Sequence, residues 1–255
     1  MRARGRRKCH SCGTLWSYFD AGSITCPSCG SARSEGTDTE PVLHTAGAAT
    51  FDPTGIRQLL EAEDITTAIR ELEPRCRVYL RDAGFIDHGT LLPLEDSVVA
   101  IAELLESATH LDMPQAAPPS VELEAYLFDL VESAMGGPRP GGEAVPDQAR
   151  HIRALGVARA VRMYFGECHR WMRARKRNGH PAIGAVRTHI ARIEALEGDI
   201  DPSSAEAILD ATRAIGEGLR HDDVDHFTRA ESQLADLRVS PTTEKGTDRA
   251  EGRQP

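Results

Sequence analysis

Apolar side chains recur every three or four residues over most of the chain after residue 52, and this period predicts amphipathic helices. Nothing after residue 50 alternates between apolar and polar residues as a half-buried strand does. About seven or eight helices are expected, near residues 52–61, 64–83, 98–108, 120–134, 147–178, 181–196, 201–219 and 224–237. The pattern therefore predicts helices packed on helices in an all-α, multi-helix domain.

Residues that start and stop helices support these boundaries. Asp52-Pro53 and Asp201-Pro202 each place a capping carboxylate before a proline that suits the first helical turn. Ser120 is a cap of the same kind, and Gly84 is expected to end a helix. Pro74 lies inside a periodic segment, where proline removes a backbone donor, so we expect a break or a kink there.

The first 30 residues follow a different pattern, in which two Cys-x-x-Cys pairs are each followed by glycine. Between the pairs, residues 14–19 are predicted as a strand, 20–22 as a turn and 23–25 as a returning strand. Four thiolates at this spacing can close a tetrahedron around one metal ion, as in a zinc ribbon. The predicted ligands are Cys9, Cys12, Cys26 and Cys29.

All four positions of this site are cysteine, so no coordination position is left for water and the metal is expected to be structural. Zinc is the expected ion, because it has no redox chemistry and accepts four thiolates. Iron in a rubredoxin-like site is the alternative, since it uses the same ligands. Two disulfides are a further interpretation, which a reducing compartment and the paired spacing disfavour. His10 is expected to be a solvent-facing spacer.

The chain is expected to divide into a small β module and a larger helical domain. The zinc ribbon is predicted at residues 1–34, a polar linker at 35–51 and the helical domain at 52–238. Within the helical domain, residues 136–146 are rich in glycine and proline and form a second linker. The polar residues 239–255 are predicted to be a disordered tail. Val42, Leu43 and His44 are expected to add a short strand.

Composition places the protein among globular chains. It has 255 residues, of which 40% are hydrophobic and 27% charged. No apolar run approaches the roughly 18 residues that span a bilayer, and no apolar segment of a signal peptide follows the basic N-terminus. Cys76 and Cys168 lie on predicted helices and are expected to be buried as small hydrophobes. We therefore expect a cytoplasmic protein without membrane contact.

The net charge of −9 is unevenly distributed. Residues 1–35 carry a net charge of +4 and residues 148–192 a net charge of +10, whereas 36–147 and 193–255 are acidic. Two basic blocks in an acidic chain suggest an anionic partner. The basic blocks are equally able to dock on the acidic ones within the fold.

The second basic block lies mainly on the helix predicted at 147–178. Its basic residues form a candidate surface for phosphate or nucleic acid, because arginine binds phosphate through bidentate contacts. The alternative is a solvated face, or one paired with acidic helices. The surface consists of Arg159, Arg162, Arg170, Arg173, Lys176 and Arg177.

No enzymatic activity is indicated by the motifs that the chain contains. A four-cysteine module beside a helical bundle suggests a rubrerythrin, but such bundles need Glu-x-x-His pairs for their di-iron site. The nearest approaches, Glu106 with His110 and Glu217 with His221, are one residue too long. Nucleotide-binding loops, a Gly-x-Ser-x-Gly nucleophile and a His-Glu-x-x-His motif are also missing from the sequence.

The cysteine pairs resemble the zinc ribbon of archaeal transcription factor B, with Cys9, Cys12, Cys26 and Cys29 at the ligand positions. The whole chain resembles uncharacterised haloarchaeal proteins that join such a ribbon to a helical domain. The chain lacks the cyclin-like repeats of transcription factor B itself. We expect a non-enzymatic binding protein that contacts nucleic acid or transcription-type machinery. The alternatives are a protein-interaction adaptor with the ribbon packed on the helices, and an iron redox module.

Overall fold

The computed structural model describes residues 2–3, 5–38, 42–46, 50–61, 65–111, 113, 118–235 and 237. The predicted disordered tail at 239–255 and residue 64, the first of the helix predicted at 64–83, lie outside these residues. Within them the fold is mainly helical, with a small N-terminal β module, as the hydrophobic pattern predicts. Among the described residues, no helix combines the length and the apolar character needed to span a membrane.

One short helix, α1 (Tyr18–Ala21), belongs to the N-terminal β module, which we define as residues 5–38. The remaining α-helices form the helical body, which we define as residues 56–235. They are α2 (Ile56–Glu61), α3 (Ile65–Asp82), α4 (Asp96–Leu111), α5 (Val121–Ala134), α6 (Arg150–Ala174), α7 (Pro181–Ala195), α8 (Pro202–His221) and α9 (Val224–Ala235). Two 3₁₀ turns, η1 (Gly142–Ala144) and η2 (Asp147–Ala149), precede α6.

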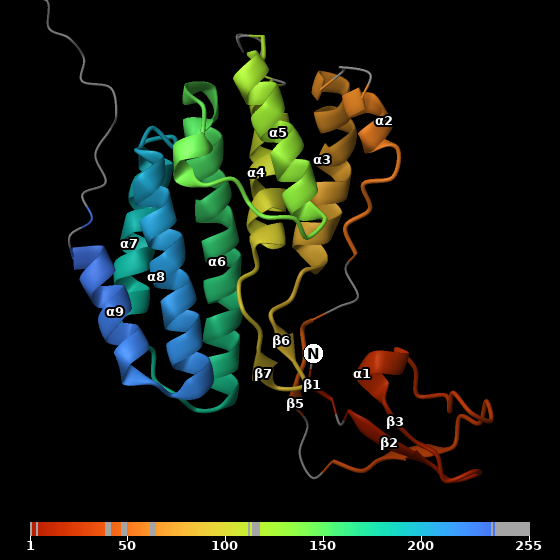
Figure 1. Ribbon diagram of the computed structural model, residues 1–255. Helices are drawn as coiled ribbons and strands as arrows, with labels where there is room; N and C mark the ends of the chain where they lie inside the picture. The colour runs from red at the N-terminus through yellow and green to blue at the C-terminus, as the bar shows by residue number, and fades with distance from the viewer. Residues whose placement is uncertain are drawn as a thin grey trace, which may run out of the picture.

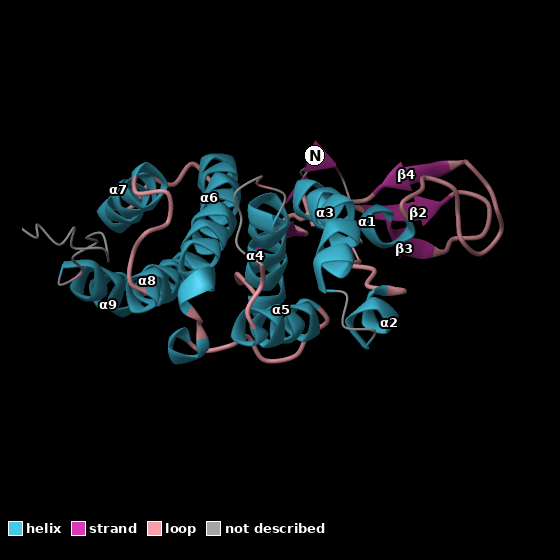
Figure 2. Ribbon diagram, turned by 90° about the horizontal axis from the view of Figure 1, so that it is seen from above, coloured by secondary structure: helices cyan, strands magenta, loops and turns pink. Residues whose placement is uncertain are grey.

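The long helices stand side by side, and the strands gather below them at one end of the molecule (Figure 1). Seen from above, α4 lies between α3 and α6, while α7, α8 and α9 form a group beyond α6 (Figure 2). The N-terminal module lies at the opposite end of this row from α7 and α9. The helical body is therefore elongated, with α4 and α6 at its centre.

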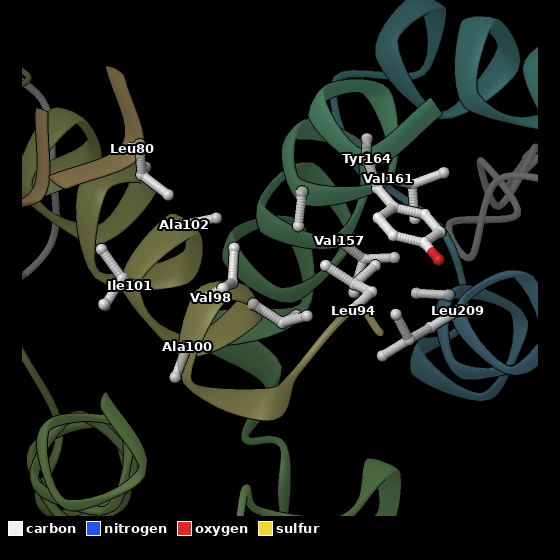
Figure 3. Close-up of a cluster of buried hydrophobic side chains, with 14 of the residues drawn as sticks. Leu80, Leu94, Val98, Ala100, Ile101, Ala102, Val157, Val161, Tyr164 and Leu209 are labelled. Atoms are coloured by element: carbon white, nitrogen blue, oxygen red, sulfur yellow. The ribbon is translucent and has the colours of Figure 1, made fainter. Parts of the chain in front are cut away.

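Helix α4 is buried on nearly all sides, which suits its run of apolar residues from Val98 to Leu105. Val98 of α4 faces Val157 of α6 in the core, next to Leu94, and Leu209 of α8 closes the same cluster (Figure 3). The α4 and α6 backbones approach closely at Gly156. A Cβ atom added there would lie 2.7 Å from Glu103 Cα, so only glycine fits.

In the described part of the chain, the β structure consists of three small antiparallel sheets. In the N-terminal module, β2 is central, paired on one side with β3 and on the other with β4. Strand β1 pairs with β5, and β6 pairs with β7. The strands are β1 (Arg2–Ala3), β2 (Arg6–Cys9), β3 (Leu15–Ser17), β4 (Ser34–Gly36), β5 (Val42–Leu43), β6 (Ile86–Asp87) and β7 (Thr90–Leu91).

The hairpin predicted between the cysteine pairs is wrong in its second half. Strand β3 ends at Ser17, the chain turns into α1, and residues 22–25 form bends in place of a returning strand. Side chains, in place of a second strand, bond the backbone carbonyls of this loop. Trp16 Nε1 donates to Ser23 O over 3.2 Å, and Ser34 Oγ donates to Ile24 O over 2.8 Å. Strands β3 and β4 both pair with β2, which ends at Cys9.

Several helix boundaries also differ from those predicted. Asp52 caps a turn, accepting from Thr54 N–H at 2.9 Å, and α2 begins only at Ile56 after Gly55, whose φ is +83°. Helix α3 runs without a break through Pro74. The long helix α6 spans 150–174 and not 147–178, because its first predicted residues form η2. The predicted starts at Ser120, Pro181 and Pro202 are confirmed.

The segment after α3 contains a β-hairpin that the periodicity did not predict. Strands β6 and β7 pair as Ile86 with Leu91 and Asp87 with Thr90. The two turn residues, His88 and Gly89, have φ values of +45° and +78°. Positive φ at both positions is typical of a type I′ turn, whose twist matches that of the strands it joins.

Candidate metal centre

The first cysteine pair lies where β2 ends. Cys9 is the last residue of β2, and its N–H donates to Thr14 O over 2.9 Å. Gly13 N–H then donates to Cys9 O over 3.0 Å, which closes the chain into a tight loop around the pair. Gly13 has a φ of +76°, a conformation that glycine adopts without a steric penalty.

The second cysteine pair repeats this geometry without an adjoining strand. Cys26 N–H donates to Ser31 O and Gly30 N–H donates to Cys26 O, each over 2.9 Å. Gly30 has a φ of +70°. The glycine after each pair therefore occupies the positive-φ position of a tight turn, and the two loops present their cysteines in the same way.

The four sulfur atoms converge on one point, all within 4.8 Å of one another. Cys9 Sγ lies 3.6 Å from Cys29 Sγ, and Cys12 Sγ lies 3.6 Å from Cys26 Sγ. A tetrahedron with metal–sulfur bonds of about 2.3 Å has edges of roughly 3.8 Å. These separations fit a single tetrahedral ion and far exceed a disulfide bond of about 2.05 Å, so all four cysteines are free thiols.

Hydrogen bonds and crowding set the acidity of the thiols. The pKa of Cys12 is lowered to about 6, chiefly by the Thr14 hydroxyl, whose oxygen lies 3.2 Å from the sulfur. Ser31 N–H lowers the pKa of Cys29, but the neighbouring thiols, Cys12 first, and burial outweigh it and raise this pKa to about 12. Four thiolates at these distances repel one another, and a divalent cation removes that repulsion.

The surroundings of the cluster suit a closed, structural metal. Cys9 and Cys26 are buried, at 1% and 2% exposure, while the second cysteine of each pair reaches the surface. His10 is exposed and lies 3.8 Å from Glu35, so it is a surface residue as expected. The cluster supplies four sulfur ligands, a set that zinc and iron both accept.

A family model matches residues 1–234, described as a family of unknown function, DUF7117. The chain belongs to this family. The match covers the N-terminal module and every described helix, so the family is defined by both parts together. No curated protein and no solved structure matches the chain.

The predicted basic surface of α6 is divided between paired and unpaired side chains. Four of its six members form ion pairs with carboxylates from the same or neighbouring helices or the α8–α9 loop. These pairs are Arg159 with Glu106, Arg162 with Glu194, Arg170 with Glu167, and Arg177 with Asp222. Docking on acidic residues, the alternative considered for this face, therefore accounts for most of it.

The remaining two members, Arg173 and Lys176, are exposed and form no ion pair with the described residues. Arg175 lies between them, although the predicted surface did not include it. Its guanidinium stacks on the Trp171 ring at 4.5 Å and donates to Gly89 O over 2.9 Å. Three cations without a carboxylate partner among the described residues therefore crowd the C-terminal end of α6.

A buried charge network was missed altogether. Arg153 and Glu103 are both fully buried, and Arg153 Nη1 lies 3.3 Å from Glu103 Oε2. Arg139, Glu206 and Tyr126 complete the network, with Arg139 Nη2 2.7 Å from Glu103 Oε1. The sequence gives one signal of this network, a glutamate within the apolar run of α4. A charge buried at such a position needs a partner of opposite charge.

Proposed function

We propose that the protein is a non-enzymatic zinc protein that binds nucleic acid through the C-terminal end of α6. The cysteine cluster supplies the structural metal, which fixes the N-terminal module. The observation that carries the proposal is the group formed by Arg173, Arg175 and Lys176, three cations without a carboxylate partner among the described residues. We call this group the α6 cation cluster.

The contrast with the rest of α6 supports this assignment. Elsewhere along the helix a carboxylate lies within reach of the exposed arginines, as Glu106 does for Arg159 at 2.5 Å. The α6 cation cluster has no such partner in the part of the chain that the structure describes. A helix C-terminus favours cations by a few tenths of a kcal/mol, which is too little to explain three of them. Phosphates supply the missing negative charge.

The position of the cluster supports the same function. Trp171 Nε1 and the Arg175 guanidinium both donate to Gly89 O, so the end of α6 is tied to the β6–β7 hairpin. The N-terminal module lies at the same end of the molecule (Figure 1). Arg6 and Lys8 are exposed on its strand β2, so basic residues from both basic blocks of the sequence lie at this end of the molecule. The resemblance of this module to transcription-type ribbons points the same way.

A protein-interaction adaptor is the second candidate, and one observation favours it. Leu15 and Ile24 of the N-terminal module are 67% and 50% exposed, which is unusual for large apolar side chains. A protein partner would cover them. An iron redox module, the third interpretation, uses the same four ligands. Metal analysis and the colour of the purified protein distinguish it from a zinc protein.

The test is a titration of the full-length protein into labelled duplex DNA, single-stranded DNA and RNA over a wide range of KCl concentration. A variant with Arg173→Gln, Arg175→Gln and Lys176→Gln removes the α6 cation cluster. If these cations contact three phosphates, the slope of log affinity against log salt becomes shallower by about 2 to 3.

A matched control carries Arg162→Gln, Arg192→Gln and Arg229→Gln, which changes the net charge equally on α6, α7 and α9. We expect this control to retain the salt slope of the wild-type protein. Equal losses in both variants would show that only net charge matters and would overturn the assigned surface. No binding at any salt concentration would reject nucleic acid as the partner and favour the adaptor.

A further inference from the structure

A second group of metal-ligating side chains lies at the joint between the N-terminal module and the helical body. His44 follows β5, while Asp87 and His88 lie at the tip of the β6–β7 hairpin. One ligand atom from each of these three residues lies within 4.8 Å of the others. Asp20 of α1, in the N-terminal module, lies 3.5 Å from His88 Nε2. Segments more than 60 residues apart in the chain therefore meet here.

We propose that His44, Asp87 and His88 form a second metal site with three protein ligands, for a divalent transition metal of the zinc class. Two imidazoles with a carboxylate select such ions over magnesium and calcium, which prefer oxygen ligands alone. The site shares no residue with the cysteine cluster. It joins the segment that follows the N-terminal module to the β6–β7 hairpin, whereas the cysteine cluster lies wholly within the module.

The separations among the ligand atoms of His44, Asp87 and His88 fit a single ion, and the Asp20 carboxylate lies next to His88. His44 Nδ1 lies 3.2 Å from Asp87 Oδ1, and His88 Nε2 lies 3.4 Å from the same oxygen and 3.5 Å from Asp20 Oδ1. Metal bonds of about 2.1 Å to nitrogen and oxygen give a tetrahedron with edges of roughly 3.4 Å. The hydrogen bond that His88 N–H donates to His44 Nδ1 is long, with 3.3 Å between the two nitrogens. A metal can therefore take its place on Nδ1 at little cost.

The backbone around these side chains is fixed before any metal binds. Thr45 N–H donates to Ile86 O and Gly89 N–H donates to Leu43 O, each over 2.8 Å, which joins the His44 segment to the hairpin. The His44 ring stacks on Phe19 of the N-terminal module, with ring centres 4.1 Å apart. Ligands on a backbone held in this way lose little conformational freedom on binding, which favours affinity.

His88 itself has an unusual conformation. Its φ of +45° lies in the left-handed region, where asparagine or glycine is the common choice at this turn position. A histidine here carries a conformational cost that a turn alone does not require. Its ring lies edge-on to Phe19, at 4.8 Å, and its Nε2 faces both carboxylates. A role as metal ligand accounts for the choice of residue.

The consequence for the molecule is a clamp. A metal held by His44 and the hairpin residues fixes the His44 segment, on which Phe19 of the N-terminal module stacks, against the helical body. Because Gly89 of the same hairpin accepts hydrogen bonds from the end of α6, the clamp also sets the module relative to α6.

The test is to dialyse the full-length protein against Zn²⁺ in a weakly chelating buffer and to measure bound metal per chain by mass spectrometry. The wild-type protein should bind two equivalents. The variant His88→Asn should bind one, because asparagine tolerates the left-handed backbone but removes the imidazole. His44→Phe keeps a ring against Phe19 and should also bind one. The control His169→Ala, at an exposed histidine of α6, should bind two.

Cobalt substitution identifies which site is lost. Thiolate-to-cobalt absorption from the cysteine cluster should keep its full intensity in His88→Asn and His44→Phe, which also shows that the N-terminal module is folded. The second equivalent should raise the thermal unfolding temperature of the wild-type protein and not that of the variants. A single equivalent in the wild-type protein, or two in both variants, would overturn the proposal and leave these residues as an ion-paired cluster.

Discussion

The N-terminal module and the helical body are stabilised in opposite ways. Among the described residues up to 38, Cys9 and Cys26 are the only buried side chains. The helical body instead buries a continuous apolar core along α3 to α9, and α4 alone contributes nine residues to it. The module is thus too thin to fold by burial, and a metal held by the cysteine cluster would supply what its core lacks. The helical body has an apolar core of its own.

This difference separates the effects of substitutions in the two parts. A change at a metal ligand should act on the module and leave the helices intact, whereas a change in the core should act on the helices and leave the cysteine cluster intact.

Cys26→Ser should abolish metal binding at the cysteine cluster and unfold the module. Serine cannot replace the thiolate, and structural zinc contributes on the order of 10 kcal/mol to folding of such small units. The readout is the loss of thiolate-to-cobalt absorption, with the thermal unfolding of the helices unchanged within a few degrees. Cys168→Ala is the control, since Cys168 is a buried cysteine of α6. It should keep the absorption and lower the unfolding temperature of the helices.

Arg153→Met should destabilise the helical body by about 3 kcal/mol, because Glu103 loses one of its two buried guanidinium partners. Urea unfolding followed by circular dichroism measures the change. Adding Glu103→Gln should recover part of the loss, since it removes the uncompensated charge. Arg159→Met is the matched control, because its pair with Glu106 is partly exposed and should cost less than about 1 kcal/mol. Equal costs at both positions would contradict the buried network.

Trp171→Phe should weaken the joint between α6 and the hairpin by about 1 kcal/mol, the usual net value of one hydrogen bond. The indole N–H donates to Gly89 O over 2.9 Å, and phenylalanine removes this donor while keeping most of the ring. Amide exchange of Gly89 and its neighbours should accelerate, whereas exchange within α8 should not. Unchanged exchange at the hairpin would show that Arg175 alone holds the contact.

Acid should destabilise the helical body through His151. Burial, and then the nearby His110, lower the pKa of His151 from 6.5 to about 4 in the folded state. The unfolded chain therefore binds more protons between these values, so stability is complete above pH 6.5 and falls as the pH approaches 4. His151→Phe keeps the ring contact with His110 and should reduce this loss, as measured by urea unfolding at pH 7 and pH 5. The exposed His169→Phe should leave it unchanged.

Local features of this fold were predictable from the sequence, because their causes lie close together in the chain. The cysteine spacing and the glycines after each pair define the metal loops, and helical periodicity locates the helices. Ser120 and Asp201 mark helix starts by accepting hydrogen bonds from residues only two or three positions away. These parts of the fold needed no knowledge of tertiary structure.

Features that depend on distant residues were missed or placed wrongly. Strand β4 has the sequence Ser-Glu-Gly, which favours no strand, and forms because β2 offers it an edge. The buried pair of Glu103 and Arg153 spans 50 positions, and His44 and His88 are 44 apart. The arginine face of α6 follows from periodicity, but three of its four acidic partners come from outside α6. Only the packed structure shows which of these basic residues have no carboxylate partner among the described residues.

Amide hydrogen exchange of the wild-type protein, measured before and after metal is removed with a strong chelator, tests the central contrast most directly. Loss of protection throughout residues 5–38, with α4, α6 and α8 still protected, is the predicted result. Protection that persists in residues 5–38 after chelation, or that is lost in all helices together, would contradict a metal-folded module beside a self-sufficient helical body.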